Sequence, residues 1–281
     1  LVEEDEDYEK INEEIEIILE IKFENISAWI KKGHNYSRWG KYDDAIFCYN
    51  NALIIDKKEN KKIDRRDWEI LYFIGNVHGY KDDNEVAKNF FKNSLKIKED
   101  YIPALQELGL TYRYSGEYEL AIKQFKKLVI IDENNIDGLD HLGYSYELNK
   151  NIKEAIECYN QSKLVENKDE KDNYADIRLA NCYYLKNDLE HAELLINKEK
   201  ITKNETSSSY KIRGAILRDK KEYDGAILNI EKWIIKNPES GDAWYQLAWC
   251  NGEKGNHELA LEYYKKNLEV NDNFNETASY A

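Results

Sequence analysis

The sequence predicts an all-α protein, a right-handed α-solenoid of stacked helix-turn-helix repeats. Only two prolines occur in 281 residues, which favours long helices because proline inside a helix removes a backbone hydrogen bond. Related segments recur along the chain, most of them 34 residues apart. An alanine occupies the same place in all seven of these segments, although the chain contains only 17 alanines. A fixed period of this length is typical of stacked repeats.

Alignment on these alanines divides the chain into seven repeats. The alanines at position 20 of the repeats are Ala45, Ala87, Ala121, Ala155, Ala192, Ala226 and Ala260. The predicted repeats are residues 26–59, 68–101, 102–135, 136–169, 173–206, 207–240 and 241–274. In each repeat we expect helix A over roughly positions 1–14 and helix B over roughly positions 15–28.

Some positions of the repeat always carry a small residue, and another always carries a large one. Position 8 is always glycine or alanine, whereas position 24 is always large: Tyr49, Phe91, Phe125, Tyr159, Ile196, Ile230 and Tyr264. Small residues at positions 8 and 20 allow two antiparallel helices to approach closely, and the large residues fill the space beside them. A bulky residue at Ala121 is therefore expected to overpack the interior, at a cost of ~1–3 kcal/mol.

Both ends of the chain continue the pattern incompletely. Residues 1–25 fit a partial repeat that has helix B only, and residues 275–281 fit the start of a further, truncated helix. Repeat arrays need polar capping repeats at their ends, and neither end shows one. We therefore expect a fragment of a longer repeat protein, and uncapped ends make end-to-end self-association possible.

In its length and in the residues at positions 4, 8, 20 and 24, the repeat resembles the tetratricopeptide repeat family, from about residue 26 to 274. The resemblance implies a concave groove lined by the A helices, mainly through positions 2, 5, 9, 12 and 13. The candidate groove residues are Arg38, Tyr72, Asn76, Tyr80, Gln106, Arg113, Tyr114, Asp140, Tyr144, Asn181, Tyr184, Lys211, Arg218, Tyr245 and Trp249. Their aromatic rings suit protein recognition. The other interpretation, that several are half-buried spacers between helices, stays open.

One subset of this family binds the acidic C-termini of heat-shock chaperones through a clamp of Lys, Asn and Arg side chains. The clamp needs Lys at position 5 beside an Asn at position 9, but here Tyr72 stands beside Asn76. Glu107 then occupies position 6 of the next repeat, where the clamp has Asn, and Asp137 occupies position 2 of the repeat after it. No register reproduces the clamp, so a heat-shock chaperone C-terminus is not expected as a partner.

Composition excludes several other classes of function. The net charge of −14 disfavours nucleic acid as a partner, and no apolar run approaches the ~20 residues that cross a bilayer. The four scattered cysteines, Cys48, Cys158, Cys182 and Cys250, show no zinc-site spacing, so we expect reduced thiols and a cytoplasmic location. No nucleotide-binding, nucleophile or metal motif occurs, so the sequence predicts no enzyme, cofactor or metal site.

The sequence thus predicts a protein-interaction scaffold that binds a peptide or helix in its groove. Two alternatives remain: a substrate-recruiting arm of a larger enzyme, such as a transferase, and a self-assembling repeat protein. The basic segment 57–67 is either a solvated loop between repeats or a dock for an acidic peptide or phosphate.

Overall fold

The computed structural model describes residues 2–59, 66–165, 174–198, 201, 203 and 205–279. Residues 60–65, within the basic segment 57–67, therefore lie outside the described residues, so neither interpretation of that segment is tested. The described chain is all α-helical, which confirms the predicted fold class. Its helices are α1 Val2–Ile21, α2 Ile26–Arg38, α3 Tyr42–Glu59, α4 Asp67–Tyr80, α5 Asn84–Ile97, α6 Ile102–Tyr114, α7 Tyr118–Ile131, α8 Ile136–Leu148, α9 Ile152–Val165, α10 Tyr174–Leu185, α11 Leu189–Ile196, α13 Ser207–Asp219, α14 Tyr223–Lys236, α15 Gly241–Glu253 and α16 His257–Ser279.

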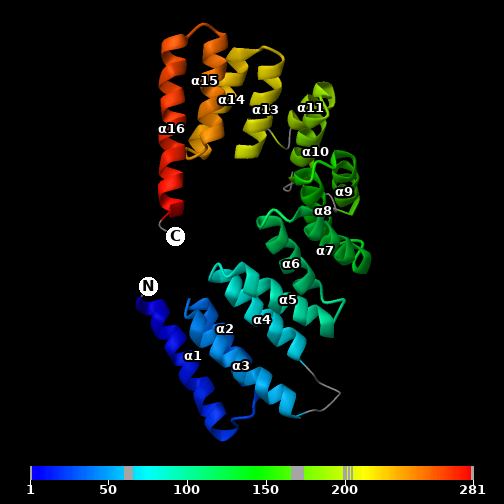
Figure 1. The fold of residues 1–281 in the computed structure, drawn as a ribbon, viewed down its shortest axis with the longest axis vertical. Coiled ribbons are helices and arrows are strands. Elements are labelled where there is room, and N and C mark those ends of the chain that lie inside the picture. Colours follow the sequence, from blue (N-terminus) through cyan, green and yellow to red (C-terminus); the bar gives the residue numbers. More distant parts are fainter. Residues whose placement is uncertain are drawn as a thin grey trace. The chain divides into compact units, whose positions relative to one another are not determined.

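The helices form two compact units, residues 1–149 with α1–α8 and residues 150–281 with α9–α16. Within the first unit, α2 packs on α3, α4 on α5 and α6 on α7 as hairpins (Figure 1). Within the second, α10 packs on α11, α13 on α14 and α15 on α16. Each hairpin also packs on the next hairpin of its own unit, so every unit is a row of helix pairs.

The turn between the two helices of a hairpin has the same backbone conformation throughout the chain. The residue at position 15 has a positive φ in all seven repeats, between 61° and 86°: Gly40, Asp82, Gly116, Lys150, Asn187, Lys221 and Gly255. A left-handed residue at this point ends helix A and redirects the chain into helix B. Four repeats place a residue other than glycine there, which costs about 1–2 kcal/mol for each such residue.

Glycine at position 8 lies directly against the large residue at position 24 of the same hairpin. A Cβ atom added to Gly33 would lie 2.5 Å from the ring of Tyr49, and one added to Gly109 would lie 2.7 Å from the ring of Phe125. Real Cβ atoms essentially never come so close to another atom, so the ring occupies the space that a side chain would need. The alanines at position 20 are also buried, and none is more than 5% exposed.

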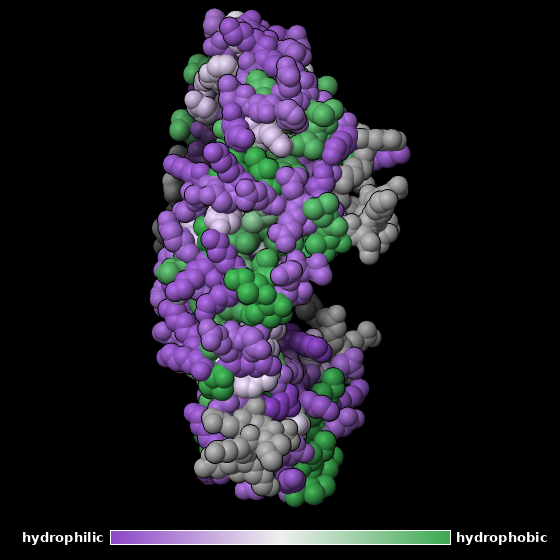
Figure 2. Space-filling model, turned by 90° about the vertical axis from the view of Figure 1, so that its right-hand side faces the viewer, coloured by the Kyte–Doolittle hydropathy of each residue, from purple (hydrophilic) through white to green (hydrophobic). Residues whose placement is uncertain are grey.

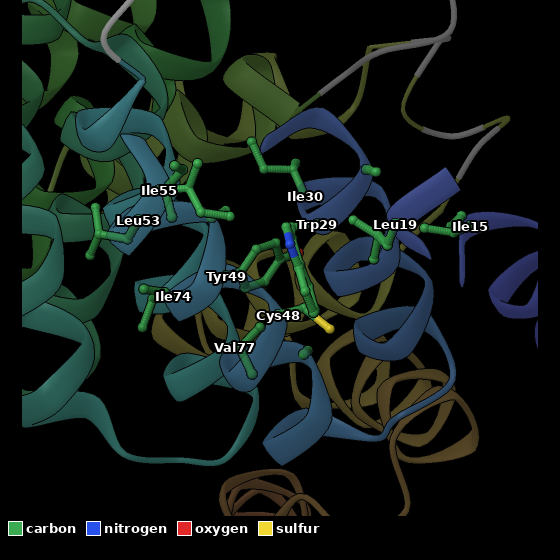
Figure 3. Packing of buried hydrophobic residues seen from close by; sticks show 14 residues of the cluster. Ile15, Leu19, Trp29, Ile30, Cys48, Tyr49, Leu53, Ile55, Ile74 and Val77 are labelled. Carbon is green, nitrogen blue, oxygen red and sulfur yellow. The ribbon is translucent and has the colours of Figure 1, made fainter. Parts of the chain in front are cut away.

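The core of the first unit is continuous from α1 to α4 (Figure 3). Trp29 and Tyr49 lie at its centre, with Leu19 of α1 on one side and Ile74 of α4 on the other. Each of these four side chains is at most 7% exposed. The face shown in Figure 2 is mostly hydrophilic, with hydrophobic patches between the hydrophilic side chains. Several large apolar side chains are exposed, among them Ile130 and Leu164.

The second unit departs from the regular repeat. Helix α11 has only eight residues, in agreement with the polar sequence that follows it. Asp176, at an otherwise apolar core position, is buried and bonded to Lys163 at 2.6 Å and Lys198 at 3.0 Å. Helix α16 runs through residue 279, past the end that the 34-residue pattern predicts, because neither proline nor glycine interrupts it.

Two glycines of α4 provide a matched test of the contact between positions 8 and 24. A Cβ atom at Gly75 would lie 2.6 Å from the ring of Phe91, whereas one at Gly79 meets nothing within 4 Å. Gly75→Ala should therefore lower the free energy of unfolding by about 1–3 kcal/mol. Gly79→Ala should raise it by about 0.5–1 kcal/mol, because alanine favours the helix. Urea denaturation measures both, and equal changes in the two variants would contradict the proposed contact.

A reciprocal exchange tests the left-handed turn. Lys221, with φ of 64°, and Gly116, with φ of 75°, occupy the same position in different repeats. Lys221→Gly should stabilise the protein by about 1 kcal/mol, and Gly116→Lys should destabilise it by a similar amount. Thermal denaturation of the two single variants measures the change, and shifts of the same sign would contradict the assignment.

Candidate binding groove

A hollow of about 560 Å³ lies between α4 and α6 in the first unit. Tyr72, Asn76 and Tyr80 line it from α4, and Glu107 and Tyr114 line it from α6. Phe91 of α5, only 2% exposed, closes its floor. This volume falls within the ~300–1,000 Å³ of typical ligand pockets, so several side chains of a partner could enter.

A second hollow, of about 280 Å³, adjoins the first. His34 and Arg38 of α2 line it, and it shares Tyr72, Asn76 and Tyr80 with the larger hollow. The two hollows have three α4 residues in common, so they adjoin along one face of α4, one toward α2 and the other toward α6. We call these two adjoining hollows together the N-terminal groove.

Helix geometry explains why these residues meet. Tyr72, Asn76 and Tyr80 are spaced four residues apart and therefore lie on one face of α4. Tyr80 is 63% exposed and Tyr114 is 77% exposed, which is unusual for such large aromatic side chains. The ring of Tyr80 stacks on Tyr42 with centroids 6.0 Å apart, and Tyr72 contacts Tyr101 edge-on at 5.3 Å. The aromatic walls are thus held in place by neighbouring rings.

Two polar groups in the larger hollow lack a partner within the described residues. The Oδ1 atom of Asn76 is buried and accepts no hydrogen bond. The carboxyl group of Glu107 is half-buried, and burial alone raises its pKa above the ordinary value, with no cation to oppose the effect. A buried acceptor that lacks a donor costs free energy, so both groups are suited to receive a donor from a ligand.

Arg113 and its neighbours form a separate cluster beside the groove. The guanidinium of Arg113 lies 5.5 Å from the ring of Tyr114 and 5.0 Å from the ring of Tyr144. Its Nη1 lies 3.2 Å from Nδ1 of His141. Burial and the charge of Arg113 lower the pKa of His141, so the neutral imidazole accepts this hydrogen bond. The cluster fixes the end of α6 that carries Tyr114.

In the second unit, the candidates Tyr184 and Arg218 meet in a network of hydrogen bonds, and a third candidate, Trp249, packs against it. Arg218 donates to the hydroxyl of Tyr184 at 2.8 Å, and that hydroxyl donates to Asp219 at 2.9 Å. Arg218 also forms an ion pair with Asp219 at 2.7 Å, and its guanidinium lies 5.7 Å from the ring of Trp249. Burial and the bond to Asp219 raise the pKa of Tyr184. These groups satisfy one another, so the network leaves few bonds for a ligand.

The other candidates are more dispersed. Lys211 lies 3.7 Å from Asp242 and over the ring of Trp233, at a small hollow of about 60 Å³. Tyr245 is 48% exposed and contacts the ring of Tyr264 at 5.7 Å. The remaining candidates are half-buried on their A helices: Gln106, Asp140 and Asn181.

The structure thus brings Arg38, Tyr72, Asn76, Tyr80 and Tyr114 together in one groove. Several residues that line the larger hollow are not among the candidates predicted from the sequence, including Asn84, Glu107 and Thr111. The sequence singles out Glu107 only because it differs from the chaperone clamp. A charged residue at position 6, beside the apolar core positions, is the signal that could have identified Glu107.

The described residues include no group of three or more His, Cys, Asp or Glu side chains placed to hold a metal ion. In the same part of the chain, no helix is long and apolar enough to cross a membrane. The four cysteines are buried and none forms a disulfide within the described residues, and burial raises the pKa of Cys48 to about 12. That thiol is therefore protonated at neutral pH and a poor nucleophile.

The rows of helical hairpins define an α-helical repeat protein. Family models of the tetratricopeptide repeat match residues 26–59, 69–101, 102–135, 136–169 and 241–274, together more than half of the chain. The chain belongs to the tetratricopeptide repeat family. Repeat arrays of this kind are scaffolds with extended surfaces that other proteins can bind.

Solved structures of the same fold support this assignment. A tetratricopeptide repeat protein from Parabacteroides merdae has a TM-score of 0.71 at 17% identity, over 87% of this chain and 93% of its own. Cut9–Hcn1, an APC/C hetero-tetramer, has a TM-score of 0.66 at 16% identity, over 95% of this chain and 50% of its own. YrrB, described as having an unusual peptide-binding site, has a TM-score of 0.56 at 18% identity, over 74% and 97%. No curated protein matches the sequence.

The buried carboxyl of Glu107 has a measurable effect on stability. Its pKa in the folded protein lies above the ordinary value, so ionisation at neutral pH opposes folding. Glu107→Gln should therefore raise the unfolding midpoint at pH 7. The difference should disappear below about pH 4, where the carboxyl is protonated in both states. The exposed Glu133→Gln is the control, and an equal midpoint shift at both pH values would contradict the explanation.

Proposed function

We propose that the protein is a scaffold that binds a peptide segment of another protein in the N-terminal groove. The observation that carries this proposal is that two hollows adjoin along α4, between α2 and α6, with exposed tyrosines along their walls. Tyrosine provides a large, rigid contact area and a polar group at little conformational cost.

The groove is already formed in the free protein. Phe91 closes the floor, and Tyr42 and Tyr101 hold the wall tyrosines through ring contacts. A preformed site loses less conformational freedom on binding, which favours affinity. The description of YrrB as a peptide-binding protein of this fold is consistent with such a role.

The second unit is a weaker candidate for the main site. Its charged groups are paired with one another, as Arg218 is with Asp219 and Lys211 with Asp242. A ligand would have to replace these bonds before it gained new ones, so its net gain would be small. The groove of the first unit offers unsatisfied acceptors instead.

Selection from a random nonapeptide display library tests the proposal. Peptides selected on the wild-type protein should bind the double variant Tyr80→Ala/Tyr114→Ala at least ~10-fold more weakly, because aromatic hot spots each contribute more than about 1 kcal/mol. Fluorescence polarisation measures the dissociation constants. The control Ile130→Ala/Leu164→Ala removes two equally exposed side chains outside the groove and should leave binding unchanged. Equal loss in both double variants, or no loss in either, would refute the groove.

A further inference from the structure

We propose that the hollow between α4 and α6 receives an arginine or lysine side chain of the bound peptide. This inference rests on the proposed function and specifies the chemistry of the partner. The occupant is an extended segment of another protein that carries at least one basic residue.

Two acceptors in the hollow are not satisfied by any donor of the described residues. Within the described residues, Asn76 Oδ1 is buried without a hydrogen-bond partner, and neither a cation nor a donor offsets the desolvation of the Glu107 carboxyl. Both groups line the same hollow. A guanidinium or ammonium group is a donor only, and it carries the charge that a desolvated carboxylate needs.

The walls of the hollow also suit a cation. Tyr80 and Tyr114 present exposed rings on opposite sides, one from α4 and one from α6. The face of a tyrosine ring attracts a cation placed within about 6 Å of its centre. Arg113 shows this contact at the outer edge, where its guanidinium lies 5.5 Å from the ring of Tyr114. The aliphatic part of an arginine or lysine would meanwhile contact Leu110.

The charges around the hollow favour the same occupant. Asp82 and Glu107 are the charged side chains that line it, and none of its lining residues is a lysine, arginine or histidine. Cations outside it are already engaged or line the adjoining hollow: Arg113 donates to His141, Lys81 is paired with Asp43, and Arg38 lines the adjoining hollow. The net charge of −14 for the whole chain also attracts basic peptides from a distance. An acidic or apolar side chain would leave Glu107 desolvated and unpaired.

The test uses peptides selected from the random nonapeptide library on the wild-type protein. The selected peptides should carry arginine or lysine, and synthesis with citrulline in place of arginine removes the charge but keeps the shape. Citrulline should weaken binding to the wild type at least ~10-fold, the usual effect of losing a charged hydrogen bond. Toward Glu107→Gln, the difference between the arginine and citrulline peptides should be several-fold smaller than toward the wild type, with the tyrosine rings and Asp82 accounting for what remains. Glu133→Gln, which removes an exposed carboxylate in the turn before α8, should behave as wild type.

The outcomes separate this inference from the proposed function. If the binding of selected peptides depends on Tyr80 and Tyr114 but not on an arginine of the peptide, the assignment of a basic side chain is overturned. The proposal that peptides bind in the groove is then retained. Equal weakening by citrulline in the wild type and in Glu107→Gln would also overturn that assignment alone. A library that yields no binder, or binders indifferent to Tyr80 and Tyr114, would overturn both proposals.

Discussion

The structure depends above all on the contact between a glycine or alanine at position 8 and a large residue at position 24. In the first unit, Phe91 and Phe125 fill the volume that a Cβ atom at Gly75 and Gly109 would need. This contact fixes how closely helix A lies to helix B. Since helix B supplies the ring that also closes the floor of the larger hollow, the same contact determines the depth of the groove. Positions 8 and 24 of the repeat therefore determine both the packing of the two helices and the depth of the groove.

Regular features of the fold could be predicted because they repeat. The alanines and glycines recur with the period of the hairpin, and each occurrence reports the same local contact. The exceptions follow from chemistry that occurs once. Nothing in the period predicts that Asp176 becomes a buried acceptor for Lys163 and Lys198, since these lysines come from α9 and from the turn after α11. The length of α16 likewise depends on the absence of a helix breaker, which a repeat alignment does not weigh.

The candidate site could be predicted only in part. Tyr72, Asn76 and Tyr80 line the same hollows, because a spacing of four residues places them on one side of a helix. Whether a polar residue is free or already paired depends on side chains from other repeats. Tyr184 and Arg218 have the composition of a recognition surface, yet they bond to each other across 34 residues of sequence. Glu107 presents the opposite case, because no side chain in the described part of the chain offsets the desolvation of its carboxyl group.

The candidate residues of the first unit and those of the second unit therefore differ in whether their polar groups are already satisfied. A network whose donors and acceptors are satisfied contributes to the rigidity of the fold, and a ligand gains little from it. A desolvated carboxylate beside an orphan amide oxygen lowers the stability of the free protein, since neither group recovers the hydration that it lost. Such a cost is offset when a ligand supplies the missing donor and charge, so the least stable polar groups of the first unit are those best placed to bind. A functional site is expected where a fold leaves polar groups without hydrogen-bond partners.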